Sequence, residues 1–218
     1  MSNQEISLVD FADREKVLTI SAALFREKGF ERTSLREISK ACGMLPGSLH
    51  YRYRAKDDIL VDMMRLAIER ITSGIVDATV SIDDPLEKLR AAMRAHVNIL
   101  MSGNDMVYVL LFEWRSLHGT AHTQIVAERD RYERCWQAIL ENLRVKQYIR
   151  EGIDINLIRL IGLGAVNWVA TWYQAEGKYS LDQIGDAIWQ MLTRGILADE
   201  HLKTAKNYES ILHQEQIS

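Results

Sequence analysis

Apolar residues recur every three or four positions along almost the whole chain. This spacing is the period of an amphipathic helix, because it places the apolar side chains on one face. In the N-terminal part it predicts helices at about 12–28, 33–41 and 46–51, and a long fourth helix at 56–78. The sequence contains no convincing strand-like alternation and no Asn-Gly hairpin signal. The pattern therefore predicts an all-α protein.

The C-terminal part continues in helices and ends in a pair with an unusual pattern. The expected helix at 155–173 is apolar nearly all round its circumference, and the helix at 181–197 follows a short polar segment. A helix that is apolar on all sides must be covered on all sides. In a chain of this size, a second copy of the same helix pair is the simplest cover. We therefore expect a homodimer through residues 155–173 and 181–197.

Local signals show how the second and third predicted helices are joined. Ser34 and Glu37 have the spacing of a capping box at the start of the second helix. Gly43 allows a tight turn, and Pro46 suits the first turn of a helix, where no amide hydrogen is needed. A helix, a glycine-containing turn and a short helix form a helix-turn-helix, whose second helix enters the major groove of DNA.

The charge distribution agrees with a DNA-binding role for this region. The net charge of the 218-residue chain is −3, which by itself does not indicate a nucleic-acid-binding protein. Residues 12–60, however, contain ten Lys and Arg against seven Asp and Glu. An anionic partner is therefore expected to bind in the N-terminal quarter of the chain.

Residues 25–60, FREKGFERTSLREISKACGMLPGSLHYRYRAKDDIL, resemble the DNA-binding domain of the TetR family of bacterial transcriptional regulators. The shared positions are Phe25, Gly29, Phe30, Thr33, Ile38, Ser39, Gly43, Gly47, Ser48, Leu49, Tyr51, Lys56, Ile59 and Leu60. The resemblance implies a helix-turn-helix domain at 1–55 and a helical ligand-binding and dimerisation domain at 56–218, with the fourth helix as connector. It also implies a ligand-responsive regulator, commonly a repressor, that binds a palindromic operator as a dimer.

The helix-turn-helix pattern and the resemblance together assign candidate contacts to DNA. Ser48 and His50 are short enough to touch base edges, although His50 can equally be a solvated surface histidine. The full candidate set is Thr33, Ser34, Leu45, Pro46, Gly47, Ser48, His50, Tyr51, Arg52 and Lys56. Leu45, Pro46 and His50 depart from the family's usual residues. An alternative is therefore a ligand-binding protein that has lost its affinity for DNA.

Methionine and aromatic residues in the C-terminal part favour an apolar, adaptable pocket, although the same spacing is also typical of an ordinary helical core. Residues 167–197 resemble the branch of TetR regulators that controls steroid and fatty-acid breakdown and senses coenzyme A thioesters. The resemblance implies an acyl-CoA effector, with Arg115 and Arg159 as possible partners of an acidic ligand. The candidate ligand-binding residues are Met93, Val97, Met101, Tyr108, Leu111, Phe112, Arg115, Trp136, Trp168 and Trp172.

A helical metal protein or enzyme is the alternative from another class. His118 and His122 are one helical turn apart and could share a metal ion, although we favour a solvated helix start for this pair. The sequence contains no Glu-x-x-His, phosphate-binding loop, nucleophile elbow or zinc-protease motif. We therefore expect no enzymatic activity, no metal and no cofactor.

Three features indicate a cytoplasmic protein. Cys42 and Cys135 have no zinc-like spacing and fit reduced thiols. The N-terminus lacks the basic and apolar segments of a secretory signal. The longest clean apolar run, 106–112, is far shorter than the ~18 residues of a membrane span.

Overall fold

The computed structural model describes residues 3–102 and 105–202, and the regular elements within these ranges are all helical. The elements in chain order are α1 (Asn3–Lys28), α2 (Leu35–Ala41), α3 (Pro46–Arg52), α4 (Lys56–Thr79), α5 (Pro85–Leu100), α6 (Asp105–Phe112), a 3₁₀ turn η1 (Trp114–Ser116), α7 (Gly119–Val145), α8 (Ile155–Trp172) and α9 (Leu181–Ile196). The all-α prediction is confirmed. The chain forms two compact units: unit 1, residues 1–70 and 103–130, and unit 2, residues 71–102 and 131–218.

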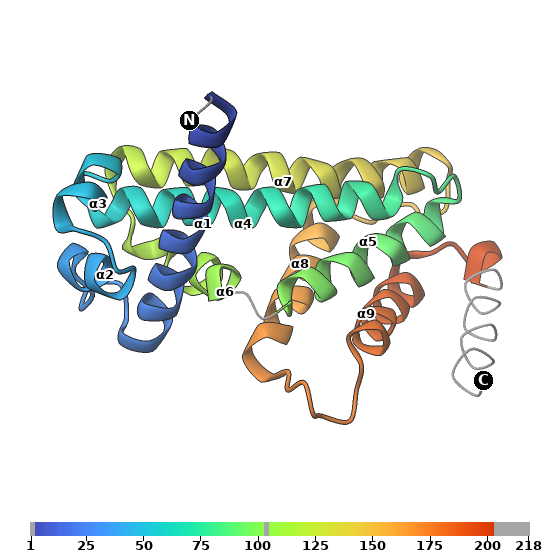
Figure 1. The fold of residues 1–218 in the computed structure, drawn as a ribbon. Helices are drawn as coiled ribbons and strands as arrows, with labels where there is room; N and C mark the ends of the chain where they lie inside the picture. Colours follow the sequence, from blue (N-terminus) through green and yellow to red (C-terminus); the bar gives the residue numbers. More distant parts are fainter. Residues whose placement is uncertain (1–2, 103–104, 203–218) are drawn as a thin grey trace. The chain divides into compact units, whose positions relative to one another are not determined.

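Unit 1 contains the predicted helix-turn-helix, in which α2 and α3 pack together beside α1 (Figure 1). The predicted capping box is confirmed: the Glu37 amide donates to Ser34 Oγ at 3.3 Å, and the Ser34 amide donates to Glu37 Oε2 at 2.9 Å. Gly43 follows α2 with a φ of +66°, a conformation that favours glycine. The small core beneath includes Phe25 and Phe30, whose rings meet edge to face.

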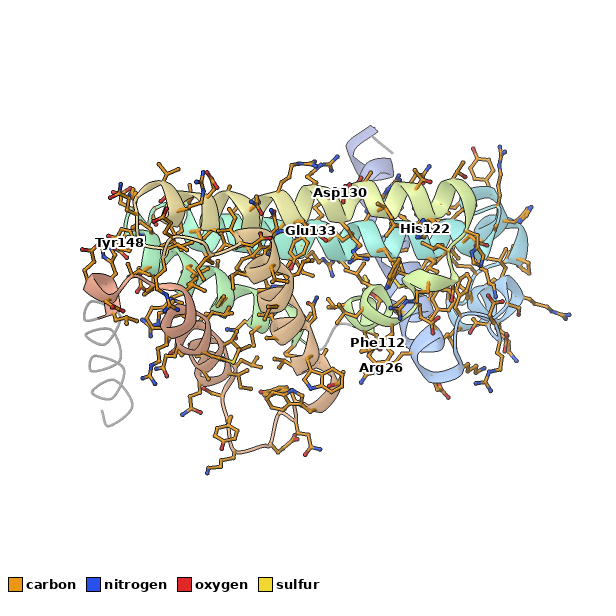
Figure 2. All side chains as sticks on the ribbon, turned by 180° about the vertical axis from the view of Figure 1, so that it is seen from behind. Arg26, Phe112, His122, Asp130, Glu133 and Tyr148 are labelled. Atoms are coloured by element: carbon orange, nitrogen blue, oxygen red, sulfur yellow. The ribbon has the colours of Figure 1, made fainter. Side chains whose placement is uncertain are left out.

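The end of α1 is anchored on α6 by one arginine. Arg26 donates to Asp105 Oδ1 at 2.6 Å, and its guanidinium lies 4.9 Å from the centre of the Tyr108 ring. Tyr108 in turn contacts Phe112 with a centroid distance of 4.5 Å, and Arg26 and Phe112 lie close together in Figure 2. The apolar segment 106–112 buries its Met and Val side chains but leaves Phe112 exposed.

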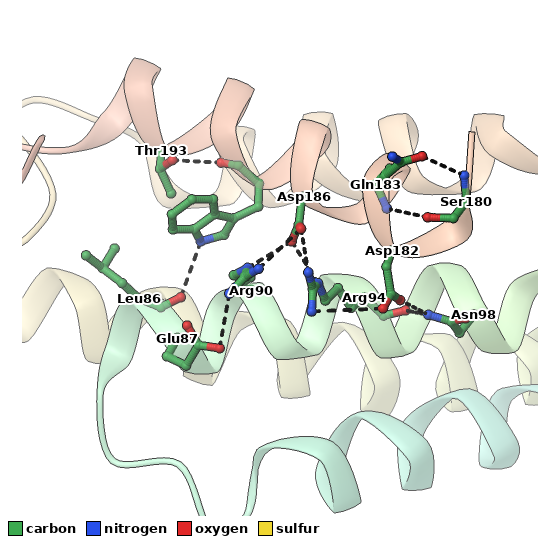
Figure 3. Close-up of polar contacts among 11 residues, drawn as sticks. Leu86, Glu87, Arg90, Arg94, Asn98, Ser180, Asp182, Gln183, Asp186 and Thr193 are labelled. Atoms are coloured by element: carbon green, nitrogen blue, oxygen red, sulfur yellow. Dashed lines mark hydrogen bonds and ion pairs between the residues drawn. The ribbon is translucent and has the colours of Figure 1, made fainter. Parts of the chain in front are cut away.

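In unit 2, α5 lies beside α9 over much of its length (Figure 1). A buried ion cluster joins the two helices (Figure 3). Asp186 accepts two hydrogen bonds from Arg90, at 2.8 and 3.2 Å, and two from Arg94, at 2.8 and 2.5 Å. The helices approach closely because residue 185 is glycine: a Cβ there would lie 3.1 Å from the Cα of Arg94.

The ion cluster changes the titration of its central carboxyl. Burial raises the pKa of Asp186, but the hydrogen bonds from Arg94 and Arg90 outweigh burial, so the net pKa lies below the ordinary value of aspartate. The carboxylate therefore stays charged throughout the physiological range. Around this cluster, Trp189 Nε1 donates to the carbonyl of Leu86 at 3.3 Å, and a Ser180–Gln183 capping box starts α9.

Some helix boundaries differ from those predicted. α1 begins at Asn3 instead of about residue 12, because the segment between contains neither proline nor glycine to stop a helix. α3 extends from Pro46 to Arg52 although its N-cap, Leu45, has no side-chain group that could bond the helix amides. The departure from the usual capping residues has therefore not prevented this helix from forming.

Candidate nucleic-acid interface and ligand cavity

The third helix presents most of the predicted DNA contacts at the surface of unit 1. Leu45, Pro46, Gly47, Ser48, His50 and Tyr51 are all exposed, and Tyr51 is 94% exposed. Leu49 points inward and is buried, so one side of this short helix forms core and the other faces solvent. Such an exposed polar helix in a helix-turn-helix has the geometry for reading a major groove.

Three other predicted DNA contacts already have partners within unit 1. Thr33 is buried, and its hydroxyl donates to the carbonyl of Gly29 at 2.9 Å. Ser34 shares its hydroxyl with Glu37 in the capping box. Lys56 Nζ donates to the carbonyls of Phe30, at 2.8 Å, and Glu31, at 3.0 Å. These side chains hold the α1–α2 connection and the start of α4, and their contacts with phosphate stay a prediction.

A polar cluster that the sequence analysis did not single out, the Asp62 hub (Asp62, Arg14 and Tyr53), fixes the end of α3. Arg14 donates to both carboxylate oxygens of Asp62, at 2.9 and 2.7 Å, and the Tyr53 hydroxyl donates to Oδ2 at 2.7 Å. Burial raises the pKa of Asp62, but the hydrogen bonds from Arg14 and Tyr53 outweigh it, and the net shift is downward. Tyr53 is buried. Its hydroxyl additionally ties the recognition helix to α1 and α4.

Unit 2 contains an apolar cavity lined by residues of α5, α7, α8 and α9. Its wall consists of Leu89, Met93, Trp136, Leu140, Ile158, Arg159, Gly162, Leu163, Val166, Leu192 and Ile196. The space inside is about 10 Å³ for positions of a water-sized sphere, room for about one water molecule. A ligand larger than this must displace side chains or move a wall.

Two polar groups stand out in this apolar wall. Trp136 is buried, and its indole Nε1 has no hydrogen-bond partner among the described residues. Arg159 is largely buried and forms an ion pair with Glu133. A buried donor without an acceptor costs free energy, about 1–3 kcal/mol.

The structure separates the predicted ligand-binding residues. Met93 and Trp136 line the cavity, while Val97 is buried in the core and Met101 is half-buried. Tyr108, Leu111, Phe112 and Arg115 belong to unit 1. Trp168 and Trp172 lie on the exposed side of α8. The other cavity residues were not predicted as ligand contacts, because an aliphatic residue at helical spacing carries no signal that distinguishes cavity from core.

A buried histidine lies beside the cavity wall. The His96 ring is completely enclosed, its centroid is 5.7 Å from that of Trp136, and Tyr132 Oη lies 3.4 Å from each ring nitrogen. Burial lowers the pKa of His96 to about 3. The imidazole is therefore neutral in the folded protein at neutral pH.

This histidine makes stability fall in mild acid. In the unfolded chain His96 protonates near pH 6.5, but in the folded chain only near pH 3, so the unfolded state binds the extra proton between these values. The contribution of neutral His96 to the free energy of unfolding is complete above pH 6.5 and is lost as the pH falls below this value. We expect the free energy of unfolding to drop by roughly 2 kcal/mol between pH 7.5 and 5 from this group. Urea unfolding at both pH values measures it.

The control for this pH dependence is a pair of variants. His96→Gln should remove most of the drop, whereas the exposed His118→Gln should retain it. A drop of the same size in His96→Gln would contradict the assignment. The depressed pKa values of Asp62 and Asp186 place their titration below this pH window.

One face of α8 is apolar and exposed in the single chain. It carries Leu157, Leu160, Ile161, Trp168 and Trp172, and Met191 is exposed on α9. By length and composition alone, α8 is apolar enough to cross a membrane, with a mean hydropathy of 1.2. This property of α8 is not apparent from uninterrupted apolar runs in the sequence, because Arg159 and Asn167 interrupt the run. A helix that joins two subunits passes the same test.

The two histidines considered as a metal-binding pair, His118 and His122, lie in different surroundings. His122 stacks on Trp114 with a centroid distance of 5.8 Å, and His118 is exposed. Within the described part of the chain, no three His, Cys, Asp or Glu side chains gather in a way that could hold a metal ion.

Both the N-terminal and the C-terminal part of the chain match known protein families. Residues 17–63 match the family described as bacterial regulatory proteins, tetR family. Residues 82–196, more than half of the chain, match the family described as tetracyclin repressor-like, C-terminal domain. The chain belongs to the TetR family. As a TetR regulator it is a DNA-binding protein that responds to a small ligand, and it is not an enzyme.

Individual relatives align with more than four fifths of this TetR regulator and with more than nine tenths of their own length. The transcriptional repressor KstR2 of Mycobacterium tuberculosis is 24% identical, over 84% of this chain and 92% of its own length. The fatty acid metabolism regulator protein of Bacillus subtilis is 23% identical, over 83% and 94% respectively. The crystal structure of AibR in complex with isovaleryl coenzyme A and operator DNA superposes with a TM-score of 0.75 at 25% identity, over 83% of this chain and 98% of AibR.

These matches confirm the predicted family, fold class, regulatory function and partner classes, and TetR regulators are dimers. The predicted contact residues and the predicted boundary between residues 55 and 56 stay predictions.

Proposed function

We propose that this TetR regulator is a cytoplasmic repressor whose effector is an acyl-CoA thioester. The observation that carries the effector assignment is the apolar cavity of unit 2, lined in part by Trp136, whose buried indole N–H has no hydrogen-bond partner among the described residues. The cavity suits the acyl chain, and the indole N–H suits the thioester carbonyl oxygen. The family and the exposed third helix support the DNA-binding half of the proposal. A bacterial regulator that binds operator DNA meets this DNA in the cytoplasm, which supports the proposed localisation.

The relatives support the same effector chemistry. AibR has been crystallised with isovaleryl coenzyme A and operator DNA together, and the Bacillus subtilis relative is named a fatty acid metabolism regulator. Arg159, in the cavity wall, offers a guanidinium to the anionic part of such a ligand. Its ion pair with Glu133 keeps that charge compensated while the cavity is closed.

The small size of the cavity gives the effector a way to act. An acyl chain cannot enter a space for about one water molecule unless the walls move, so a bound effector selects a conformation with a wider cavity. Met93 can adapt its shape at low cost, because its side chain is unbranched. α4 and α7 each contribute residues to both units, so they provide continuous backbone through which such a change can reach unit 1.

We also propose that the dimer forms through the apolar face of α8 together with α9. Tryptophans on a helix surface are typical anchors of protein interfaces. A two-fold axis would place Trp168 and Trp172 against the same face of a second copy, and thereby remove from water the patch that a single chain leaves exposed.

Selection of bound sequences from a random duplex pool tests the DNA-binding half. We expect a palindrome whose half-sites are about one helical turn apart, ~34 Å. A folded dimer that enriches no sequence at moderate salt would refute the repressor assignment and favour a ligand-binding protein without DNA recognition.

Release from the selected operator tests the effector. We expect isovaleryl-CoA or a longer acyl-CoA to release the protein, and free coenzyme A or the free acid to do so much less effectively. Trp136→Phe keeps most of the ring and removes the N–H, so it should weaken the response to acyl-CoA about five- to tenfold. Its affinity for operator without effector should stay within about twofold of wild type.

The proposal fails if no acyl-CoA releases the operator. An unchanged response of Trp136→Phe would exclude the indole N–H as a partner of the effector but leave the effector class standing.

A further inference from the structure

An apolar tip, formed by the N-cap residue Leu45 and the first helical residue Pro46, stands at the start of the recognition helix α3. Leu45 is 76% exposed, and Pro46 is exposed beside it. The Leu45 carbonyl accepts the amides of Ser48, at 3.0 Å, and Leu49, at 3.3 Å, so the backbone of the tip is fixed by the first turn of the helix. The side chain of Leu45 therefore stands on an anchored backbone and points to solvent.

The tip differs in chemistry from the surface around it. Ser48, His50 and Tyr51 follow on α3 and are exposed polar side chains. Residues 12–60 contain an excess of three positive charges, which suits a polyanionic partner. An exposed leucine at this place gains nothing from the core and can form no hydrogen bond. If the helix approaches DNA, the tip must meet base edges that it can contact without hydrogen bonds.

Among the groups that line the major groove, the C5-methyl group of thymine is the one suited to an apolar contact. The other groups that distinguish the base pairs are hydrogen-bond donors or acceptors. A leucine placed against one of them would displace its water without offering a hydrogen bond in return. We propose that the apolar tip of each protomer reads the methyl group of a thymine in its operator half-site, with Leu45 as the specificity-determining residue. This inference rests on the DNA-binding function proposed above. It assigns to Leu45 a positive role in recognition instead of a loss of recognition.

Replacement of thymine by deoxyuridine tests the contact, because it removes only the methyl group and keeps every hydrogen-bonding group. Operator duplexes from the sequence selection carry this replacement at one thymine at a time, in one or both half-sites. When uracil replaces the contacted thymine of one half-site, the full-length wild-type protein should bind about fourfold more weakly than it binds the unmodified operator. This factor corresponds to the loss of one buried methyl group. Replacement in both half-sites should weaken binding to the operator about fifteenfold.

Leu45→Ala completes the comparison. This variant should bind the thymine operator more weakly than wild type and should no longer distinguish thymine from uracil at that position. Val80→Ala is the matched control, because Val80 is also 76% exposed but lies in unit 2, after α4. It should keep the full preference for thymine.

Three outcomes would overturn the inference. They are indifference of the wild-type protein to uracil at every position, the same preference for thymine in Leu45→Ala as in wild type, and the absence of thymine from the selected half-sites. In each of these cases a normal operator affinity would leave the DNA-binding function intact. Absence of binding to any duplex would overturn both the function and the inference.

Discussion

Asp186→Asn should lower the free energy of unfolding by about 3–5 kcal/mol, which is the usual cost of removing one partner from a buried ion pair. The reason is geometric: Arg90 and Arg94 direct four hydrogen bonds at this one carboxylate between α5 and α9 (Figure 3). When Asp186 loses its charge, Arg90 stays buried, and among the described residues its remaining ion-pair partner is Glu87 at 3.6 Å. Urea unfolding at pH 7.5 and a fixed protein concentration measures the loss.

Asp182→Asn is the matched control for this prediction. Asp182 also pairs with Arg94, at 3.9 Å, and accepts a hydrogen bond from Asn98 at 2.8 Å, but its side chain is mostly exposed. Exposed pairs contribute little, so its loss should cost under about 1 kcal/mol. Equal costs for the two substitutions would show that the buried cluster does not hold α5 against α9.

The pH dependence of this cluster has a definite sign. Because the pKa of Asp186 is lower in the folded chain than in the unfolded chain, its stabilisation is complete above about pH 4 and is lost as the pH falls through the folded pKa. The wild-type advantage over Asp186→Asn should therefore persist at pH 5, where the contribution of His96 is already declining.

Trp168→Arg should convert the dimer into monomers at micromolar concentration. Trp168 is 66% exposed in the single chain, so the substitution should leave the fold of the protomer unchanged. In the proposed dimer, the two-fold axis repeats the change in both copies. Loss of a tryptophan anchor costs ~2 kcal/mol or more per copy, which weakens association about a thousandfold. Sedimentation velocity measures the mass, and circular dichroism checks that the helices remain.

Val145→Arg is the control for the dimer interface, because Val145 is 68% exposed on unit 2 but lies at the end of α7. It should stay dimeric and bind operator like wild type. Trp168→Arg should bind operator much more weakly, because a monomer contacts only one half-site. A dimeric Trp168→Arg protein would remove this face of α8 from the interface.

Features that depend on neighbours in the sequence were predictable. The Ser34–Glu37 capping box and the turn at Gly43 use groups within a few residues of one another, and the structure contains both. The helix-turn-helix followed from these local signals together with the periodicity of the apolar residues. The extra length of α1 shows the limit of the same approach: a helix without a stop signal continues until something else ends it.

The polar clusters were less accessible from sequence. The Asp62 hub joins residues 14, 53 and 62, and Asp186 meets an arginine 96 positions earlier. A charged residue at a helical core position is a weak signal by itself, because most charged residues of a helix lie on its solvated face.

The sequence alone determined the all-helical class, the order of the helices, the recognition turn and the apolar character of α8, because each depends on local geometry and composition. The tertiary structure decided which apolar residues face a cavity and which face solvent. Trp136 and Trp168 show the difference: both are tryptophans in long helices, yet Trp136 lines the cavity and Trp168 lies on the outer face of α8. The direction of each side chain is set by the helices packed around it, and these are distant in sequence.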